Sequence, residues 1–173
     1  YNAGLKIEEG KAKLAQQHTD SYDRVLRVFP YANAEKAKSI YPDMEDAIKR
    51  VSTVISKHTM YDKRGNEKPA SEHWIDDNWL LYGEAMFFKH EYFQALDAFE
   101  YVEATYKTEA GRFLASMWIA KTYLELTQLN EAEGKLDYLR NIREFPKKNK
   151  WELEATFADF YVQVRNYEKA IEH

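Results

Sequence analysis

The chain has 173 residues, of which 45% are hydrophobic and 31% are charged, a composition typical of a folded domain and not of a disordered chain. Its net charge is −4 and its Lys and Arg residues are scattered, so no basic stripe is available to bind nucleic acid. The absence of Cys excludes disulfides, thiol catalysis and thiolate metal sites, and no run of about 20 apolar residues could span a bilayer. Only 6 Gly and 4 Pro leave little material for the turns of a β-sandwich, which favours helices.

Residues 1–58 predict an irregular helix pair with a long insertion at 19–41. The first helix is expected over residues 5–17. The second is expected from Pro42 to about His58, because a proline is well tolerated in the first turn of a helix. Its apolar stripe follows the helical spacing and consists of Ala47, Val51, Val54 and Ile55.

Two segments of this region do not follow a helical pattern. Residues 25–31 (VLRVFPY) of the insertion are too apolar for a free loop, so we expect them to pack against the helices. Residues 59–73 are predicted to form a loop, and the charged, turn-rich stretch 61–71 within it is the part we expect to be mobile.

A repeated pattern occupies residues 74–173. Trp79, Tyr82, Gly83 and Met86 follow the W-x2-hydrophobic-G-x2-hydrophobic spacing, and a second helix follows with Tyr92, Ala95, Leu96 and Phe99. This is the tetratricopeptide (TPR) signature, in which small residues let two antiparallel helices approach. The pattern recurs twice, so we predict repeats at 74–107, 109–144 and 147–173, the last one truncated. The small residue of the second helix recurs at intervals slightly longer than the usual unit of about 34 residues, at Ala95, Ala132 and Ala170.

The longer intervals place extra residues in the linkers at 107–111 and 144–150. With the first pair, the repeats predict an all-α fold: a right-handed α–α superhelix, or TPR-like solenoid, of about four helix pairs.

The sequence offers no recognisable catalytic or metal site. None of the five His residues forms an i, i+4 pair, and there is no Gly-rich phosphate loop. The adjacent acids Asp76 and Asp77 could be a catalytic or metal-binding pair, but acids in the first turn of a helix also stabilise its positive end, and we favour that role. We therefore expect no enzyme activity, no catalytic residue, no metal and no cofactor.

A partner-binding groove is the better hypothesis. In such arrays the first helices of successive pairs line a concave face. The alternative that Phe88 and Trp118 only fill the contact between repeats stays open. Glu84, Lys121 and Asp159 form a polar row, and Glu84 would repel a partner's C-terminal carboxylate, which disfavours a chaperone-tail receptor. The candidate groove residues are Asp77, Leu81, Glu84, Phe88, Met117, Trp118, Lys121 and Asp159.

Several strings resemble a known family. Residues 37–44 (AKSIYPDM), 74–77 (WIDD) and 158–161 (ADFY), together with 91–92 and 99–102, resemble the N-terminal region of the gliding-motility and type IX secretion lipoproteins of Bacteroidetes known as SprE or PorW. The resemblance covers nearly the whole chain. It implies a lipoprotein at the periplasmic face of the outer membrane, held in the membrane only by a lipidated Cys upstream of this sequence. It also implies partners among the subunits of the secretion and motility machine.

Two other functions stay open. Glycan-binding surface lipoproteins of the same bacteria carry TPR helices, but they need long aromatic insertions, and this chain offers only 19–41 and 61–71. A generic outer-membrane assembly factor would share the helix pairs but not the strings. The chain starts without an initiator Met and ends inside a helical pattern, so we interpret it as a piece of a longer protein. The identity of the partner, the surface it uses and the oligomeric state stay open.

Overall fold

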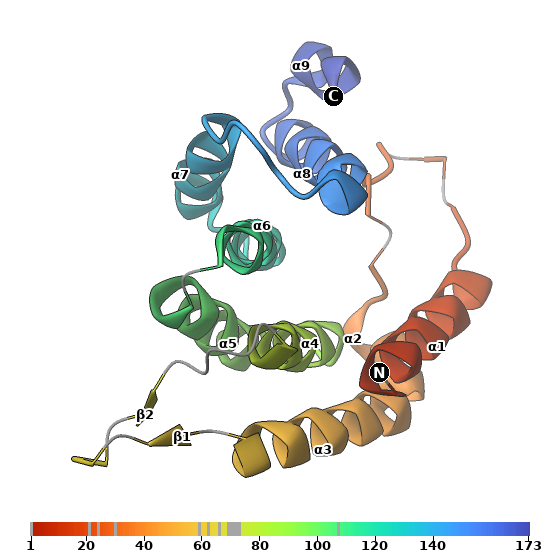
Figure 1. The fold of residues 1–173 in the computed structure, drawn as a ribbon. Helices are drawn as coiled ribbons and strands as arrows, with labels where there is room; N and C mark the ends of the chain where they lie inside the picture. The colour runs from red at the N-terminus through yellow and green to blue at the C-terminus, as the bar shows by residue number, and fades with distance from the viewer. Residues whose placement is uncertain are drawn as a thin grey trace.

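The computed structural model describes residues 2–20, 22–23, 25–29, 31–58, 60–61, 63–65, 67–68, 74–106 and 108–173. Within these ranges the regular secondary structure is helical apart from one small hairpin, and the helices pack in consecutive pairs (Figure 1). The predicted all-α, TPR-like superhelix is therefore confirmed.

Four helix pairs follow one another along the arc in Figure 1. Each pair also contacts the next, and α1, α4, α6 and α8 touch one another in succession along the inner side of the arc. The helices α3, α5, α7 and α9 form the outer layer. The pairs are α1 (Asn2–Gln17) with α3 (Tyr41–His58), α4 (Trp74–Phe88) with α5 (Tyr92–Thr105), α6 (Glu109–Glu125) with α7 (Leu129–Arg140), and α8 (Lys150–Gln163) with α9 (Tyr167–Glu172).

The turns inside the last three pairs repeat one another. His90, Thr127 and Arg165 each adopt a left-handed backbone conformation, with φ of 64°, 57° and 59°. After each of them, the next N–H donates to a carbonyl five residues earlier, as Gln128 does to Tyr123. This is the usual way in which a helix ends before a sharp turn. The sequence pattern that defined the repeats therefore reappears as a repeated backbone geometry.

We expect the replacement of Thr127 by glycine to stabilise the protein by about 1 kcal/mol, because a left-handed backbone is unfavourable for a β-branched residue and free for glycine. Urea unfolding followed by circular dichroism measures the change. Thr53 is a matched control, since it is exposed inside helix α3, where glycine lowers stability. A Thr127→Gly protein less stable than the wild type would contradict the expectation.

The pairs pack closely because small residues sit at the crossing points. In α4, a Cβ atom on Gly83 would collide with the ring of Phe99 in α5, which is fully buried. The alanines of the repeat pattern, Ala95, Ala120 and Ala132, are also fully buried. The apolar core therefore runs continuously through the helix pairs instead of forming one central cluster.

Gly83→Ala is expected to destabilise the protein by about 1–3 kcal/mol, because the Phe99 ring must move out of a packed site. Gly134 in α7 is the matched control, since a Cβ there meets nothing within 4 Å. Gly134→Ala should stabilise the protein by about 0.5–1 kcal/mol through helix propensity alone. Equal effects of the two substitutions in urea unfolding would show that close packing at Gly83 does not matter.

The N-terminal third differs in detail from its prediction. Helix α1 begins at Asn2 instead of residue 5, and α3 begins at Tyr41, one residue before Pro42. The insertion contains α2 (Ala34–Ala37), capped by the Asn33 side chain, followed by the 3-10 turn η1 (Lys38–Ile40). A second 3-10 turn, η2 (Lys147–Asn149), precedes α8.

The predicted loop at 59–73 contains a hairpin in its described part. Strands β1 (Met60–Tyr61) and β2 (Glu67–Lys68) pair antiparallel. Gly65 lies in the turn between them with φ of 81°, a conformation that favours glycine. Residues 59, 62, 66 and 69–73 lie outside the described residues, so the expected mobility of 61–71 stays a prediction.

Candidate functional site

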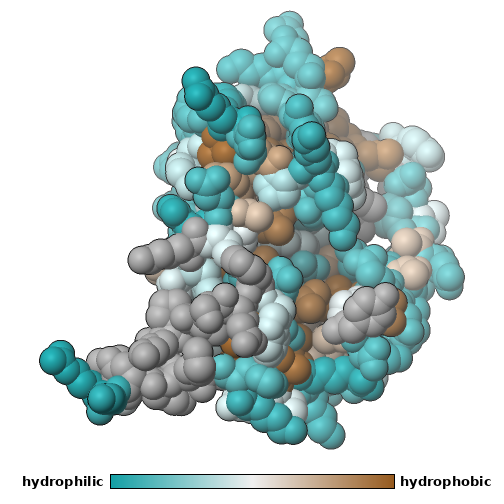
Figure 2. Space-filling model, viewed as in Figure 1, coloured by the Kyte–Doolittle hydropathy of each residue, from teal (hydrophilic) through white to brown (hydrophobic). Residues whose placement is uncertain are grey.

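The inner face of the superhelix is the candidate site. Side chains from α4, α6 and α8 meet there, and in Figure 2 hydrophobic residues show in the middle of the molecule while hydrophilic residues cover most of its rim. The inner face is not empty. Part of the insertion crosses it, and in Figure 1 the segment between α1 and α2 runs beside α8 and back down to α2.

An ion-pair network holds this segment to the last inner helices. The Arg27 guanidinium lies 2.7 Å from the Asp159 carboxylate in α8 and 2.5 Å from the Glu125 carboxylate at the end of α6. The Val28 backbone N–H donates to the second oxygen of Asp159 at 3.3 Å. The side chains of Asp159 and Glu125 are only 1% and 10% exposed, so water screens these contacts little. One arginine therefore joins two successive repeats.

Aromatic contacts hold the next part of the segment. The Tyr31 ring lies edge-on to the rings of Phe87 and Phe88 in α4, with centroids 5.0 Å and 6.1 Å away. Phe29 stacks on Tyr31 at 5.4 Å. These geometries are the favourable ones for aromatic pairs. Burial raises the pKa of Tyr31 well above its usual value, and Glu125 adds to the shift.

Lys121 lies at the centre of the inner face. It is 3% exposed, and its Nζ is 3.9 Å from the Trp118 ring centroid and 4.4 Å from that of Phe29. The same Nζ pairs with the Glu152 carboxylate of α8 at 2.5 Å. Burial lowers the pKa of Lys121, and the Glu152 charge opposes this shift. The lysine is thus held between aromatic faces and a carboxylate.

Charges of alternating sign continue along the inner layer. Lys11 of α1 pairs with Glu8 and lies over the Phe88 ring, and it interacts electrostatically with Glu84 of α4. Burial raises the pKa of Glu84 to about 7, and Lys11 only partly offsets this effect. Each inner helix therefore contributes one charged group to a row made of Lys11, Glu84, Lys121 and Glu152.

The structure brings together most of the predicted groove residues, but not as an open surface. Glu84, Phe88, Trp118, Lys121 and Asp159 all belong to the inner layer, and the last four are buried. Phe29 and Tyr31 of the predicted packing segment 25–31 pack against the helices and cover this face, whereas Val25, Leu26 and Val28 stay exposed and residue 30 lies outside the described residues. The burial of Phe88 and Trp118 favours the interpretation that they fill contacts within the protein.

The other three predicted residues lie elsewhere. Met117 is fully buried in the apolar core of the helices. Leu81 is half-buried against α1, where it lies close to Gly4. Asp77 is exposed in the first turn of α4.

The neighbour of Asp77, Asp76, has a structural role in the fold. It is 3% exposed and accepts hydrogen bonds from the Thr108 hydroxyl at 2.6 Å and from the Asp77 N–H at 3.0 Å. The bond from Thr108, the N-cap residue of α6, joins the start of α4 to the start of α6, and the bond from Asp77 lies within the first turn of α4. They support the interpretation of Asp76 as a group that stabilises helix ends over its interpretation as a catalytic acid.

Sequence reasoning missed Arg27 and Glu125. Two signals were available. Glu125 is an acid in the last turn of α6, where a negative charge is unfavourable unless a cation meets it. Arg27, Phe29 and Tyr31 alternate with other residues, the pattern of an extended segment with one face packed.

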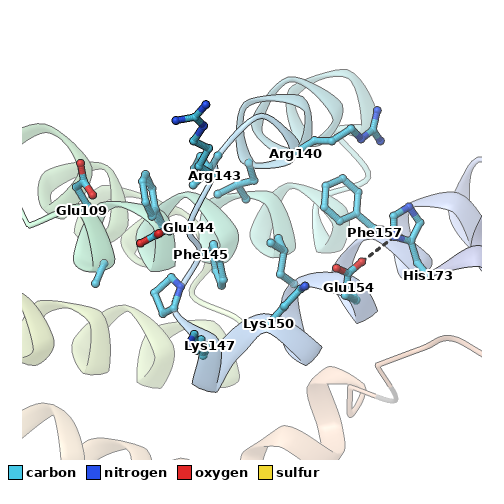
Figure 3. Close-up of a pocket in the computed structure, with 16 residues that line it drawn as sticks. Glu109, Arg140, Arg143, Glu144, Phe145, Lys147, Lys150, Glu154, Phe157 and His173 are labelled. Atoms are coloured by element: carbon cyan, nitrogen blue, oxygen red, sulfur yellow. Dashed lines mark hydrogen bonds and ion pairs between the residues drawn. The ribbon is translucent and has the colours of Figure 1, made fainter.

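A separate cavity of about 670 Å³ lies between α6, α7 and α8 (Figure 3). Both of the longer linkers of the repeat pattern contribute to it, through Glu109 on one side and residues 144–147 on the other. Phe145 and Phe157 supply apolar surface, and Glu154 pairs with His173 at its edge.

Other kinds of site were not found in the part of the chain that the structure describes. There, no group of three or more His, Cys, Asp or Glu side chains could hold a metal ion. No helix among the same residues is long and apolar enough to cross a membrane. No protein-family model matches the chain, and a comparison with curated proteins finds no significant match.

Proposed function

We propose that this chain is a non-catalytic scaffold that binds other proteins through the inner face of its helical array. The observation that carries the proposal is a non-helical segment of the chain packed on that face through an ion pair, a backbone hydrogen bond and aromatic contacts. These are the interactions with which a repeat array holds an extended segment of a partner. The inner face thus has the chemistry of a peptide-binding site.

The family resemblance supports a cellular setting for the scaffold. In this setting the scaffold lies at the periplasmic face of the outer membrane and is attached through a lipid anchor upstream of this sequence. It is then part of the type IX secretion and gliding-motility machinery. Its partners are then other subunits of that machine, and it uses no cofactor. The support consists of residues 37–44, 74–77 and 158–161, which resemble strings of that family.

A glycan-binding function is less well supported. It needs aromatic side chains free to stack on a sugar, whereas Phe29 and Tyr31 of the insertion pack against Lys121 and Phe87. We expect no oligosaccharide to bind the isolated domain in a glycan array. Specific binding of one glycan class there would favour the surface-lipoprotein function instead.

In-cell crosslinking of the full-length protein tests the scaffold function. Lys121 is too buried for a photoreactive probe, so we choose Val25, which is 58% exposed beside Arg27 at the edge of the inner face. Phe93 on the outer layer, 68% exposed, is the matched control position. We expect mass spectrometry to identify a secretion-machine subunit captured by the Val25 probe and not by the Phe93 probe. Capture only by the Phe93 probe, or by neither, would contradict binding at the inner face.

A further inference from the structure

We infer that residues 25–29 and Tyr31 act as an internal ligand of the groove, and that the partner docks by displacing them with a segment of the same chemistry. That segment carries an arginine, an aromatic residue two positions later and a second aromatic residue two positions after that. The inference rests on the proposed scaffold function. It adds the kind of partner and a competition between the partner and the protein's own segment.

The geometry of the segment sets the spacing of the residues that a partner must carry. Arg27, Phe29 and Tyr31 contact side chains of α4, α6 and α8, whereas the neighbouring Leu26 and Val28 are 38% and 37% exposed. The chain bends at residues 28–29, and the Tyr31 N–H donates to the Phe29 carbonyl at 2.8 Å, so the Phe29 and Tyr31 rings stack on each other. Recognition of the segment therefore depends on the spacing of these three residues as well as on composition.

The acidic end of the groove consists of Asp159 and Glu125, which bind Arg27. Arg27 is the basic group that the structure places on both Asp159 and Glu125, and its two terminal nitrogens each meet a different carboxylate. When the segment leaves, Asp159 keeps the Gln163 amide and Glu125 keeps the Tyr92 hydroxyl, and neither of these neutralises a charge. A planar guanidinium can bridge two carboxylates, whereas the compact ammonium of a lysine bridges them poorly. The groove therefore selects arginine at this position.

The aromatic part of the groove holds the Phe29 and Tyr31 rings. The rings of Phe87 and Phe88 meet the Tyr31 ring edge to face, and the Nζ of Lys121, which lies over the Trp118 ring, also lies over the rings of Phe29 and Tyr31. Lys121 adds a cation that favours an aromatic face over an aliphatic side chain. An aromatic pair at the second and fourth positions after the arginine fits these contacts.

The internal contact is weak enough for a partner segment to displace it. The segment is tethered at both ends, by α1 and by α2, so it competes at an effective concentration in the millimolar range. Its exposed side chains Val25, Leu26 and Val28 add little buried area. A partner segment with further contacts can therefore displace it, whereas segments that match it only weakly are excluded.

A peptide-binding experiment on the 173-residue chain tests the inference. The probe is a fluorescent synthetic peptide with the sequence of residues 22–33, and the readout is fluorescence anisotropy. The opened protein carries Arg27→Ala, Phe29→Ala and Tyr31→Ala. We expect it to bind the peptide at least about tenfold more tightly than the wild type, because the tethered competitor is lost. Tyr31→Phe, which keeps the ring, is the control that should behave like the wild type.

Two further variants place the peptide in the groove. Adding Asp159→Asn to the opened protein should abolish most of the gain, and so should a peptide in which the arginine is replaced by lysine. If the triple variant loses its helical circular dichroism signal, Arg27→Ala alone is used, and the same order of affinities is expected.

The inference would be overturned if a helical opened protein bound the peptide no better than the wild type. It would also be overturned if sedimentation showed a wild-type dimer that Asp159→Asn dissociates, because the groove would then hold the segment of a second copy. The in-cell crosslinking and the peptide experiment are independent. A scaffold that captures its partner but whose opened form ignores the peptide keeps its function and loses this mechanism.

Discussion

Replacing Trp118 with alanine is expected to destabilise the protein by about 3–5 kcal/mol, a large fraction of the stability of an ordinary domain. The indole is 5% exposed and contacts the rings of Phe87, Phe88 and Phe99, so its loss leaves a cavity that touches both helices of the second pair. It also removes the aromatic face under the Lys121 ammonium. Urea unfolding measures the change in the free energy of unfolding.

Trp151 provides the control for this substitution. It lies in α8 and is 68% exposed, so Trp151→Ala should change the free energy of unfolding by less than about 0.5 kcal/mol. Similar effects of the two tryptophan substitutions would mean that the inner layer is not the packed centre of the second and third pairs.

Glu84→Gln is expected to remove a pH dependence of stability. Burial raises the pKa of Glu84 to about 7 in the folded protein, whereas a glutamate in the unfolded chain has its ordinary value of about 4.5. Between these values the folded state binds more protons than the unfolded state, so wild-type stability falls as the pH rises from about 4.5 to 7. The loss is on the order of 2–3 kcal/mol above pH 7.

The measurement is a series of urea unfolding curves from about pH 4 to about pH 8. The Glu84→Gln protein should be close to the wild type at the acidic end and more stable than it at the alkaline end. Glu133→Gln is the control, because Glu133 is exposed on α7 and should leave the wild-type pH dependence intact. A Glu84→Gln protein that keeps the wild-type pH dependence would mean that Glu84 is well hydrated in the folded state.

The fold could be predicted because its determinants are local. Small residues recur where two helices must touch, at Gly83 and Ala120 in the first helix of a pair and at Ala95 and Ala132 in the second, and this spacing can be recognised without knowing which segments meet at long range. The hairpin at β1 and β2 was missed because it carries no such local pattern. Its two-residue strands are too short to show any alternation of apolar and polar residues.

The candidate site was only half predictable. Repeat phase assigns Lys121 and Asp159 to the inner layer, but it cannot tell whether that layer faces solvent. Arg27 and Asp159 are 132 residues apart, and no periodicity connects an irregular insertion to a particular helix. The polar row was therefore expected to be accessible, whereas burial and ion pairing satisfy Lys121 and Asp159 within the chain.

The contact between Arg27 and Asp159 also has a consequence for folding. A plain solenoid is nearly one-dimensional: each repeat touches only its neighbours, so its ends can unravel one at a time. Here a segment that emerges from the first helix pair is attached to the last one. Closing so long a loop costs entropy and slows the final stage of folding, but once it is closed neither terminal pair can come apart without also losing contacts at the other end. The segment therefore converts a stack of separable repeats into one cooperative unit.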